Sequence, residues 1–259
     1  MIRILVESEL HCGNVLGLTP PDYWTRHSRR FAEPVWTWRQ EMIKRVGRID
    51  VHILNGDLTD GPGKKETIGI FTTDVEKQAG IAAECAREVR CRERFLTYGT
   101  NFHAVSTLSH ENLVAKELHA PIKETLRMRA GGVRFNFRHV VGRSDIPYGQ
   151  GTQVQKEIVR DQLQALLEEF KDADVIGRGH VHYFLHIETG SKHAFTGPSW
   201  ELPNPDEGTA IYPRGLRTMY YNMGAVLIEV VNGEPWIRKQ IMPLKVAIQR
   251  PYIEIGEGK

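Results

Sequence analysis

Apolar residues at every second position open the chain, at Ile2, Ile4 and Val6, and predict a β-strand. After a long polar loop, the range 35–46 carries apolar residues at helical spacing and predicts a helix. The same two patterns predict further elements in this half: a strand over 49–54, a helix over 74–89 and a strand over 94–98. Strands and helices therefore alternate, which indicates an α/β core.

The second half of the chain becomes richer in strand patterns. The expected elements are helices over 110–118 and 154–170, and strands over 133–141, 174–177, 220–231 and 234–244. Asn232 and Gly233 give a turn signal between the last two strands. We find no repeat of fixed period, no low-complexity tract and no Gly/Ser linker, so we expect one domain over residues 1–259.

Composition is that of an ordinary globular protein, with 41% hydrophobic and 25% charged residues and a net charge of +2, so nucleic acid is neither implied nor excluded as a partner. Cys12, Cys85 and Cys91 form no CxxC pair, which argues against a disulfide framework or a thiolate zinc site. The chain lacks the apolar run of a signal peptide or a membrane span, so we expect a cytoplasmic protein without membrane contact.

Polar side chains gather directly after the expected strands, where loops hold them over a rigid sheet. The groups are, in chain order, Glu9 to His11, Gly56 to Asp60, Gly99 to His103, His139 within a strand, and Gly179 to His182. Imidazole nitrogen and carboxylate oxygen suit a metal of borderline hardness, and a pair at i and i+2 can aim both side chains at one point. The ordered set therefore favours a metal site.

Each fragment alone also has a structural interpretation. Asp57 and Asp60 could cap a helix or fix a turn. His180 and His182 could be ordinary strand residues, and His139 among apolar neighbours could be a satisfied core histidine. It is the ordered combination that favours metal over these alternatives.

In this order the blocks resemble those of the calcineurin-like metallophosphoesterase superfamily, which are DxH, GDxxD, GNH, a lone histidine and GHxH. The specific matches are GDLTDG and GRGHVH, and the chain is similar to phosphoesterases of phages and bacteria over most of its length. The resemblance implies an α/β fold with a β-sandwich core flanked by helices, in four layers (αββα). It also implies two divalent metal ions, with manganese expected first and iron, zinc, nickel or magnesium as the other candidates.

The resemblance implies a role for each matching residue. The first metal would be held by Glu9, His11, Asp57 and His182, and the second by Asp57, Asn101, His139 and His180. Asp57 would bridge the two ions, and His103 would protonate the leaving oxygen. Asp60 is expected to orient an imidazole or close the turn.

Two places near the blocks offer substrate contacts. Arg178 precedes the GHVH block and could bind phosphate through its planar guanidinium. Tyr23, Trp24 and Arg26 lie in a loop that interleaves aromatic residues with arginines, which would suit a nucleotide or a single strand. The alternative for this loop is that its aromatic residues anchor it to the core.

The match departs from the family at two points. Glu9 stands where the family has aspartate, and Phe102 separates Asn101 from His103. The leading hypothesis is hydrolysis of a phosphomonoester or phosphodiester, including a nucleotide or nucleic acid, by a dinuclear-metal-activated hydroxide. The alternative is a degenerate metallophosphoesterase fold that serves as a binding or scaffolding module.

Overall fold

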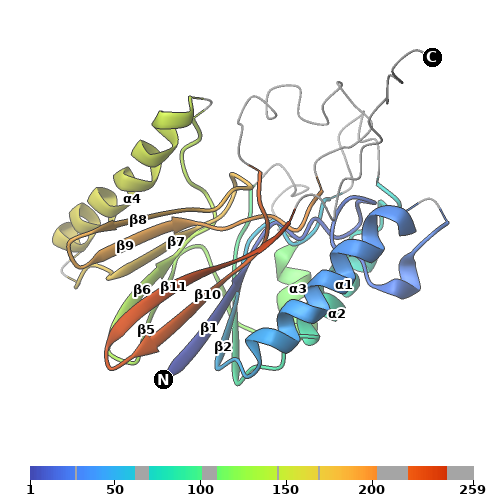
Figure 1. The fold of residues 1–259 in the computed structure, drawn as a ribbon, viewed down its shortest axis with the longest axis horizontal. Helices are drawn as coiled ribbons and strands as arrows, with labels where there is room; N and C mark the ends of the chain where they lie inside the picture. The colour runs from blue at the N-terminus through green and yellow to red at the C-terminus, as the bar shows by residue number, and fades with distance from the viewer. Residues whose placement is uncertain are drawn as a thin grey trace, which may run out of the picture.

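The structure is a computed structural model of the chain. It describes residues 1–26, 28–61, 70–100, 110–144, 146–168, 170–202 and 221–243. The described elements form two β-sheets with helices outside both (Figure 1).

The first sheet has six strands in the order β11-β10-β1-β2-β3-β4. Their bounds are β1 Ile2–Glu7, β2 Val51–Asn55, β3 Glu93–Thr97, β4 Ile122–Lys123, β10 Met223–Val231 and β11 Glu234–Met242. Strands β1 to β4 run parallel, whereas β10 is antiparallel to both of its neighbours. Because β1, β2 and β3 are parallel, the loops that follow them leave from the same edge of the sheet.

The second sheet has five strands in the order β5-β6-β7-β9-β8. Their bounds are β5 Leu126–Ala130, β6 Val133–Phe137, β7 Val175–Arg178, β8 Leu185–Thr189 and β9 Lys192–Thr196. The adjacent strands β6 and β7 are parallel, so their following loops also emerge side by side.

The two sheets pack face to face through one apolar core. Val6 and Ile53 from the first sheet belong to the same buried cluster as Phe135, Val175 and Phe195 from the second. These residues alternate along their strands with residues that face the helices, as the period of two in a strand requires. The sandwich therefore forms the two inner layers of the fold.

Helices cover both outer faces of the sandwich, as Figure 1 shows with α4 on one side and the other helices on the opposite side. Their bounds are α1 Arg29–Val46, α2 Val75–Arg87, α3 Glu111–Leu118 and α4 Pro147–Leu167, and a short 3₁₀ helix η1 covers Pro21–Tyr23. The first three helices share a core with Leu5 and Leu54, whereas α4 packs on Ile176 and Ala194. The expected four-layer αββα arrangement is confirmed.

Most expected elements are present, with shifted ends. Helix α4 begins at Pro147, seven residues before the apolar periodicity starts, because its first turns are polar and the pattern does not reveal them. Strand β6 ends at Phe137, so the expectation that His139 lies within a strand is wrong. The turn between β10 and β11 is confirmed, with Asn232 and Gly233 both at positive φ as a tight hairpin requires.

Among the described residues, no helix combines the length and the hydropathy that a membrane crossing needs.

Candidate metal centre

Four loops meet at the ends of parallel strands and bring the predicted ligands together. The loop after β1 runs beside the loop after β2, with Glu9 N donating to Gly56 O at 3.1 Å and His11 N donating to Asp57 O at 3.2 Å. The loop after β7 joins the loop after β6 through a hydrogen bond from Gly179 N to His139 O of 2.8 Å. The backbone thus places ligands from both sheets at one position.

The backbone is unusual at these ligands. Of the seven non-glycine residues with positive φ in the described ranges, five belong to the predicted site: Glu9, His11, Asp57, His180 and His182. The left-handed region costs free energy for residues with a side chain, and such residues cluster at functional sites. The strain is therefore concentrated where the candidate ligands converge.

Two glycines leave room for the converging side chains. A Cβ at Gly99 would lie 2.1 Å from Asp57 Oδ1, and a Cβ at Gly56, whose φ is +77°, would lie 2.6 Å from the His139 ring. Both distances are shorter than the contacts that a Cβ atom makes in real structures, so these positions require glycine for close packing around the site.

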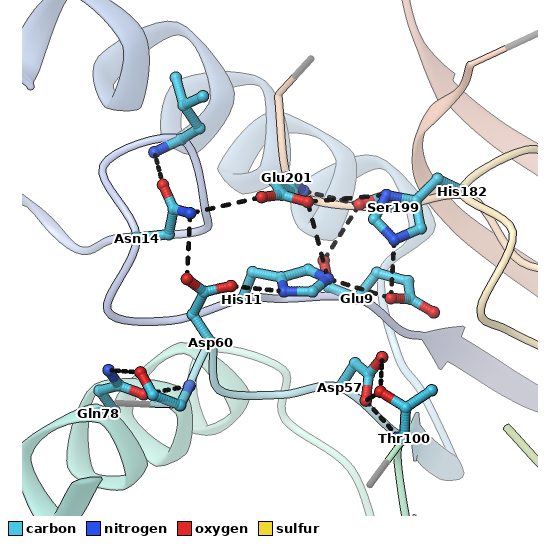
Figure 2. A network of polar contacts seen from close by, with 12 residues as sticks. Glu9, His11, Asn14, Asp57, Asp60, Gln78, Thr100, His182, Ser199 and Glu201 are labelled. Carbon is cyan, nitrogen blue, oxygen red and sulfur yellow. Dashed lines mark hydrogen bonds and ion pairs between the residues drawn. The ribbon is translucent and has the colours of Figure 1, made fainter. Parts of the chain in front are cut away.

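Glu9, His11 and His182 form the first cluster, seen in the centre of Figure 2. Glu9 Oε2 lies 3.1 Å from His11 Nε2 and 3.0 Å from His182 Nε2. One donor atom from each residue lies within 4.8 Å of the other two, which is compatible with a common metal ion. The side chains of Glu9 and His11 are buried.

Asp57, His139 and His180 form the second cluster, again with donor atoms within 4.8 Å of one another. His139 Nε2 lies 3.0 Å from Asp57 Oδ2. Thr100 orients the carboxylate, because its backbone N–H donates to Asp57 Oδ1 at 2.6 Å and its hydroxyl lies 3.1 Å from Oδ1 and 3.0 Å from Oδ2. The Asp57 and Thr100 contacts are drawn in Figure 2.

The hydrogen bonds of the imidazoles indicate which nitrogen remains for a metal. His139 Nδ1 must donate to Asn55 O, 2.7 Å away, because a carbonyl oxygen only accepts. His11 Nδ1 lies 3.1 Å from Asp60 Oδ1, and His182 Nδ1 lies 3.2 Å from the Tyr221 hydroxyl. With Nδ1 held in this way, the Nε2 atoms of all three rings are directed at carboxylates, the arrangement usual for metal-binding histidines.

The residues present fit a pair of divalent cations. His139 Nε2 is fully buried and has no hydrogen-bond partner among the described residues, although two carboxylates lie within 3.4 Å of it. A neutral imidazole would direct a lone pair at these negative oxygens, which is unfavourable unless a proton or a metal cation lies between them. The donor set of imidazole and carboxylate suits manganese, iron or zinc.

The shifted pKa values of His139 and Glu9 also indicate that the buried carboxylates of the site require positive charge beside them. Burial disfavours the charged imidazolium of His139, but the charges of Asp57 and Glu9 outweigh burial and raise the pKa of His139 to about 10. Burial likewise opposes ionisation of Glu9, yet the charges of His139 and His182 hold its pKa well below the usual range. Without metal, a proton on His139 would balance part of the negative charge of Asp57 and Glu9.

This balance predicts a pH dependence of stability in the metal-free protein. The pKa of His139 rises from 6.5 to about 10 on folding, so its contribution is complete below pH 6.5 and is lost as the pH rises through 10. We expect the free energy of unfolding, measured by urea denaturation with chelator, to fall by the order of a few kcal/mol over this range. Saturating Mn²⁺ should remove most of this dependence of the free energy of unfolding on pH, because metal-bound imidazole carries no proton at Nε2. Equal slopes with and without Mn²⁺ would contradict the metal assignment of His139.

Three polar residues at the site were not predicted from the sequence. Glu201 Oε2 lies 3.8 Å from both His11 Nε2 and His182 Nδ1, and a further group of possible ligands combines His11, Asp60 and Glu201. The Tyr221 hydroxyl donates to Glu201 O and can therefore accept from His182 Nδ1–H. Asn14 Nδ2 donates to Asp60 Oδ2 at 3.2 Å. The only available signal was an acid directly after a strand-end loop, in the sequence GPSWE.

The remaining metal-site predictions divide into two groups. Asp60 lies against His11 Nδ1, where a carboxylate can orient the ring, as the sequence suggested. Asn101 and His103 lie outside the described residues, so their expected roles as ligand and as catalytic acid stay predictions.

The expected phosphate contact of Arg178 is wrong. Residues along β7 alternate between its two faces, and Arg178 shares its face with Ile176, which packs under α4. Its Nε donates to Glu157 Oε2 at 2.8 Å and its Nη1 donates to Asn136 O at 3.0 Å. The guanidinium is buried in this ion pair on the outer face of the second sheet.

In the loop before α1, the aromatic side chains anchor the loop. The Tyr23 hydroxyl donates to Glu84 Oε2 at 3.2 Å, and its ring packs against the helical core. Trp24 Nε1 donates to Thr19 O at 2.9 Å. These contacts support the structural alternative for Tyr23 and Trp24, whereas Arg26 is exposed and its substrate contact stays a prediction.

Comparisons with known proteins show likeness in structure only. No protein-family model matches the chain, and no curated protein matches it in sequence. Similar solved structures include Vps29 proteins, a phosphodiesterase and a predicted phosphoesterase. Wild-type Vps29 of Entamoeba histolytica, complexed with zinc, is 15% identical, with 93% of this chain and 99% of that chain covered and a TM-score of 0.44.

Two further structures are described as phosphoesterases. An archaeal phosphodiesterase is 10% identical, with 93% of this chain and 100% of that chain covered and a TM-score of 0.45. A protein of Streptococcus pneumoniae described as a predicted phosphoesterase is 12% identical, with 92% and 98% covered and a TM-score of 0.38. At these identities the likeness concerns the course of the backbone and not the chemistry of the site.

Proposed function

We propose that the protein is a metal-dependent phosphoesterase that holds two divalent cations in the adjacent clusters of its site. The observation that carries this proposal is the orientation of the imidazoles. His11, His139 and His182 each have Nδ1 against an acceptor while Nε2 faces a carboxylate, a pattern that is usual for metal-binding histidines. The order of the sequence blocks, which resembles calcineurin-like metallophosphoesterases, supports the same reaction class.

The first cation would be held by Glu9, His11 and His182, and the second by Asp57, His139 and His180. Bound divalent cations would supply Lewis-acid activation of water and neutralise charge on the phosphoryl oxygens. We propose manganese as the metal, because a mixed set of imidazole and carboxylate ligands accepts it readily. The substrate class is a phosphomonoester or phosphodiester.

The protein's own residues would keep the site in its reactive geometry. Thr100 fixes both oxygens of Asp57, and Asp60 fixes the ring of His11. Tyr221 holds Nδ1 of His182 and is itself fixed by the backbone of Glu201. Such supporting hydrogen bonds orient ligands and so reduce the reorganisation needed when substrate arrives.

The test uses one preparation of the protein purified without chelator. Bound metal measured by mass spectrometry is expected to approach two equivalents, and added Mn²⁺ is expected to stimulate hydrolysis of bis-p-nitrophenyl phosphate or p-nitrophenyl phosphate. Treatment with chelator should abolish turnover, and added Mn²⁺ should restore it. Little bound metal together with no turnover would overturn the proposal and favour a fold retained as a binding module.

A further inference from the structure

We propose that helix α4 pairs with α4 of a second copy of this chain, so that the protein is a dimer. The observation that carries the inference is a stripe of exposed apolar side chains along the outer face of α4. The inference is independent of the proposed function, because α4 lies outside the second sheet whereas the candidate ligands lie in loops at strand ends (Figure 1).

Helix α4 has apolar residues on two opposite faces. Its inner face packs on the second sheet through Val154 and Ile158, which share a buried cluster with Ile176 and Ala194 of that sheet. Steps of four and three residues from Val159 place a second set on the other side of a helix with 3.6 residues per turn. In this outer stripe Val159 and Leu163 are 54% and 55% exposed, and Leu166 and Leu167 are 78% and 82% exposed.

The outer stripe extends to the beginning of the helix. Tyr148, in the first turn, is 86% exposed and precedes Val159 by about three helical turns, which places it on the same face. Together the five side chains expose on the order of 600 Å², the upper end of the range for the largest apolar patch of a monomer. A continuous apolar surface of this extent indicates a contact with another molecule.

The area of the stripe fits a second copy of the chain. Two stripes packed on each other would bury roughly 1,200 Å² in total, which is the lower limit for a specific protein–protein interface. A two-fold axis brings the same patch of both copies together, so the apolar side chains of one copy meet those of the other. Steps of four and three residues are also those by which the side chains of two helices interlock.

The charges beside the stripe fit a second copy better than a nucleic acid or a lipid surface. The uncharged Gln155 and Gln162 lie along one side of the stripe, and Lys156 and Arg160 lie along the other. Arg160 Nη1 is paired with Glu157 Oε1 at 2.5 Å, which leaves Lys156 as the unpaired cation of the outer face in the described part of α4. Nucleic acids and anionic lipid surfaces are bound by several cations. Self-pairing, in contrast, brings few like charges together.

The test is sedimentation velocity of the full chain at concentrations from about 1 to 100 µM. We expect the wild type to sediment as a dimer at the upper end of this range. Leu163→Lys, in the middle of the stripe, should raise the dimer dissociation constant at least about tenfold, because it places a charge in an apolar contact. Trp236→Lys on β11 is the matched control, since it replaces another exposed apolar residue and should leave the dissociation constant unchanged.

Three outcomes would overturn the inference. These are a wild type that stays monomeric at 100 µM, a Leu163→Lys variant that dimerises as the wild type does, and equal weakening by Leu163→Lys and Trp236→Lys. Circular dichroism identifies loss of folding, and Leu166→Lys provides a second variant in the stripe with the same expected effect. None of these outcomes bears on Mn²⁺-dependent hydrolysis, so failure of the dimer and failure of the proposed function are distinguishable.

Discussion

Replacement of His180 with alanine is expected to lower Mn²⁺-dependent hydrolysis by roughly 10³-fold while the fold is retained. His180 belongs to the cluster with Asp57 and His139, so its removal would take one ligand from the proposed second cation. A divalent cation contributes several kcal/mol of transition-state stabilisation, and a loss of about 4 kcal/mol corresponds to this factor. Initial rates on bis-p-nitrophenyl phosphate with saturating Mn²⁺ provide the measurement.

The fold should tolerate this change because the His180 side chain is only partly buried. His186→Ala on β8 is the matched control, since it removes another half-buried histidine, whose Nε2 lies 3.2 Å from His193 Nδ1 and which belongs to neither metal cluster. The control should keep the wild-type rate. A His180→Ala variant that remains fully active would remove this residue from the catalytic centre.

The largest expected effect on stability comes from Arg39, which is fully buried behind the site. Its Nε and Nη2 donate to the two oxygens of Glu7, both at 2.9 Å, and His52 Nε2 lies 2.9 Å from Glu7 Oε2. Burial opposes ionisation of Glu7, but the charge of Arg39 outweighs it and holds the pKa of Glu7 far below its usual range. Glu7 is therefore a buried carboxylate that depends on its cationic partner.

Arg39→Met is expected to lower the free energy of unfolding by about 3–5 kcal/mol, because it leaves the charge of Glu7 buried without its main partner. Urea denaturation in the presence of Mn²⁺ measures the change. The double variant Arg39→Met with Glu7→Leu should recover part of the loss, since both charges are then absent. Arg29→Met, which breaks an exposed pair with Glu33, should leave the urea midpoint nearly unchanged. If the single and double variants unfold at the same urea concentration, His52 alone compensates Glu7 and the argument fails.

Local pattern was sufficient to predict much of the fold. The alternation in β1, the helical spacing within α1 and the turn at Asn232 each depend on residues a few positions apart, so the sequence contains the whole signal. The polar first turns of α4 carry no such pattern, and the start of this helix was shifted. Strand β5 was missed although Leu126, Met128 and Ala130 alternate with arginines, because five residues give only a short signal. These segments are fixed by packing against distant parts of the chain.

The candidate ligands were also predictable, because they follow strands and occur in a recognisable order. Glu9, His11, Asp57, His139, His180 and His182 all meet at one place. Their convergence follows from a general property of parallel strands, whose carboxyl ends lie at one edge of a sheet. The sequence thus determined which residues gather at the candidate site.

Only the tertiary structure decided how these residues are arranged and supported. Arg178 directly precedes the GHVH block, yet the alternation of β7 directs it to Glu157 and away from the site. Glu201 lies 190 residues from His11, and Tyr221 lies 39 residues from His182, and no local pattern links these pairs. The convergence of the candidate ligands depends on loops from both sheets, because convergence in three dimensions is a property of packing and not of spacing along the chain.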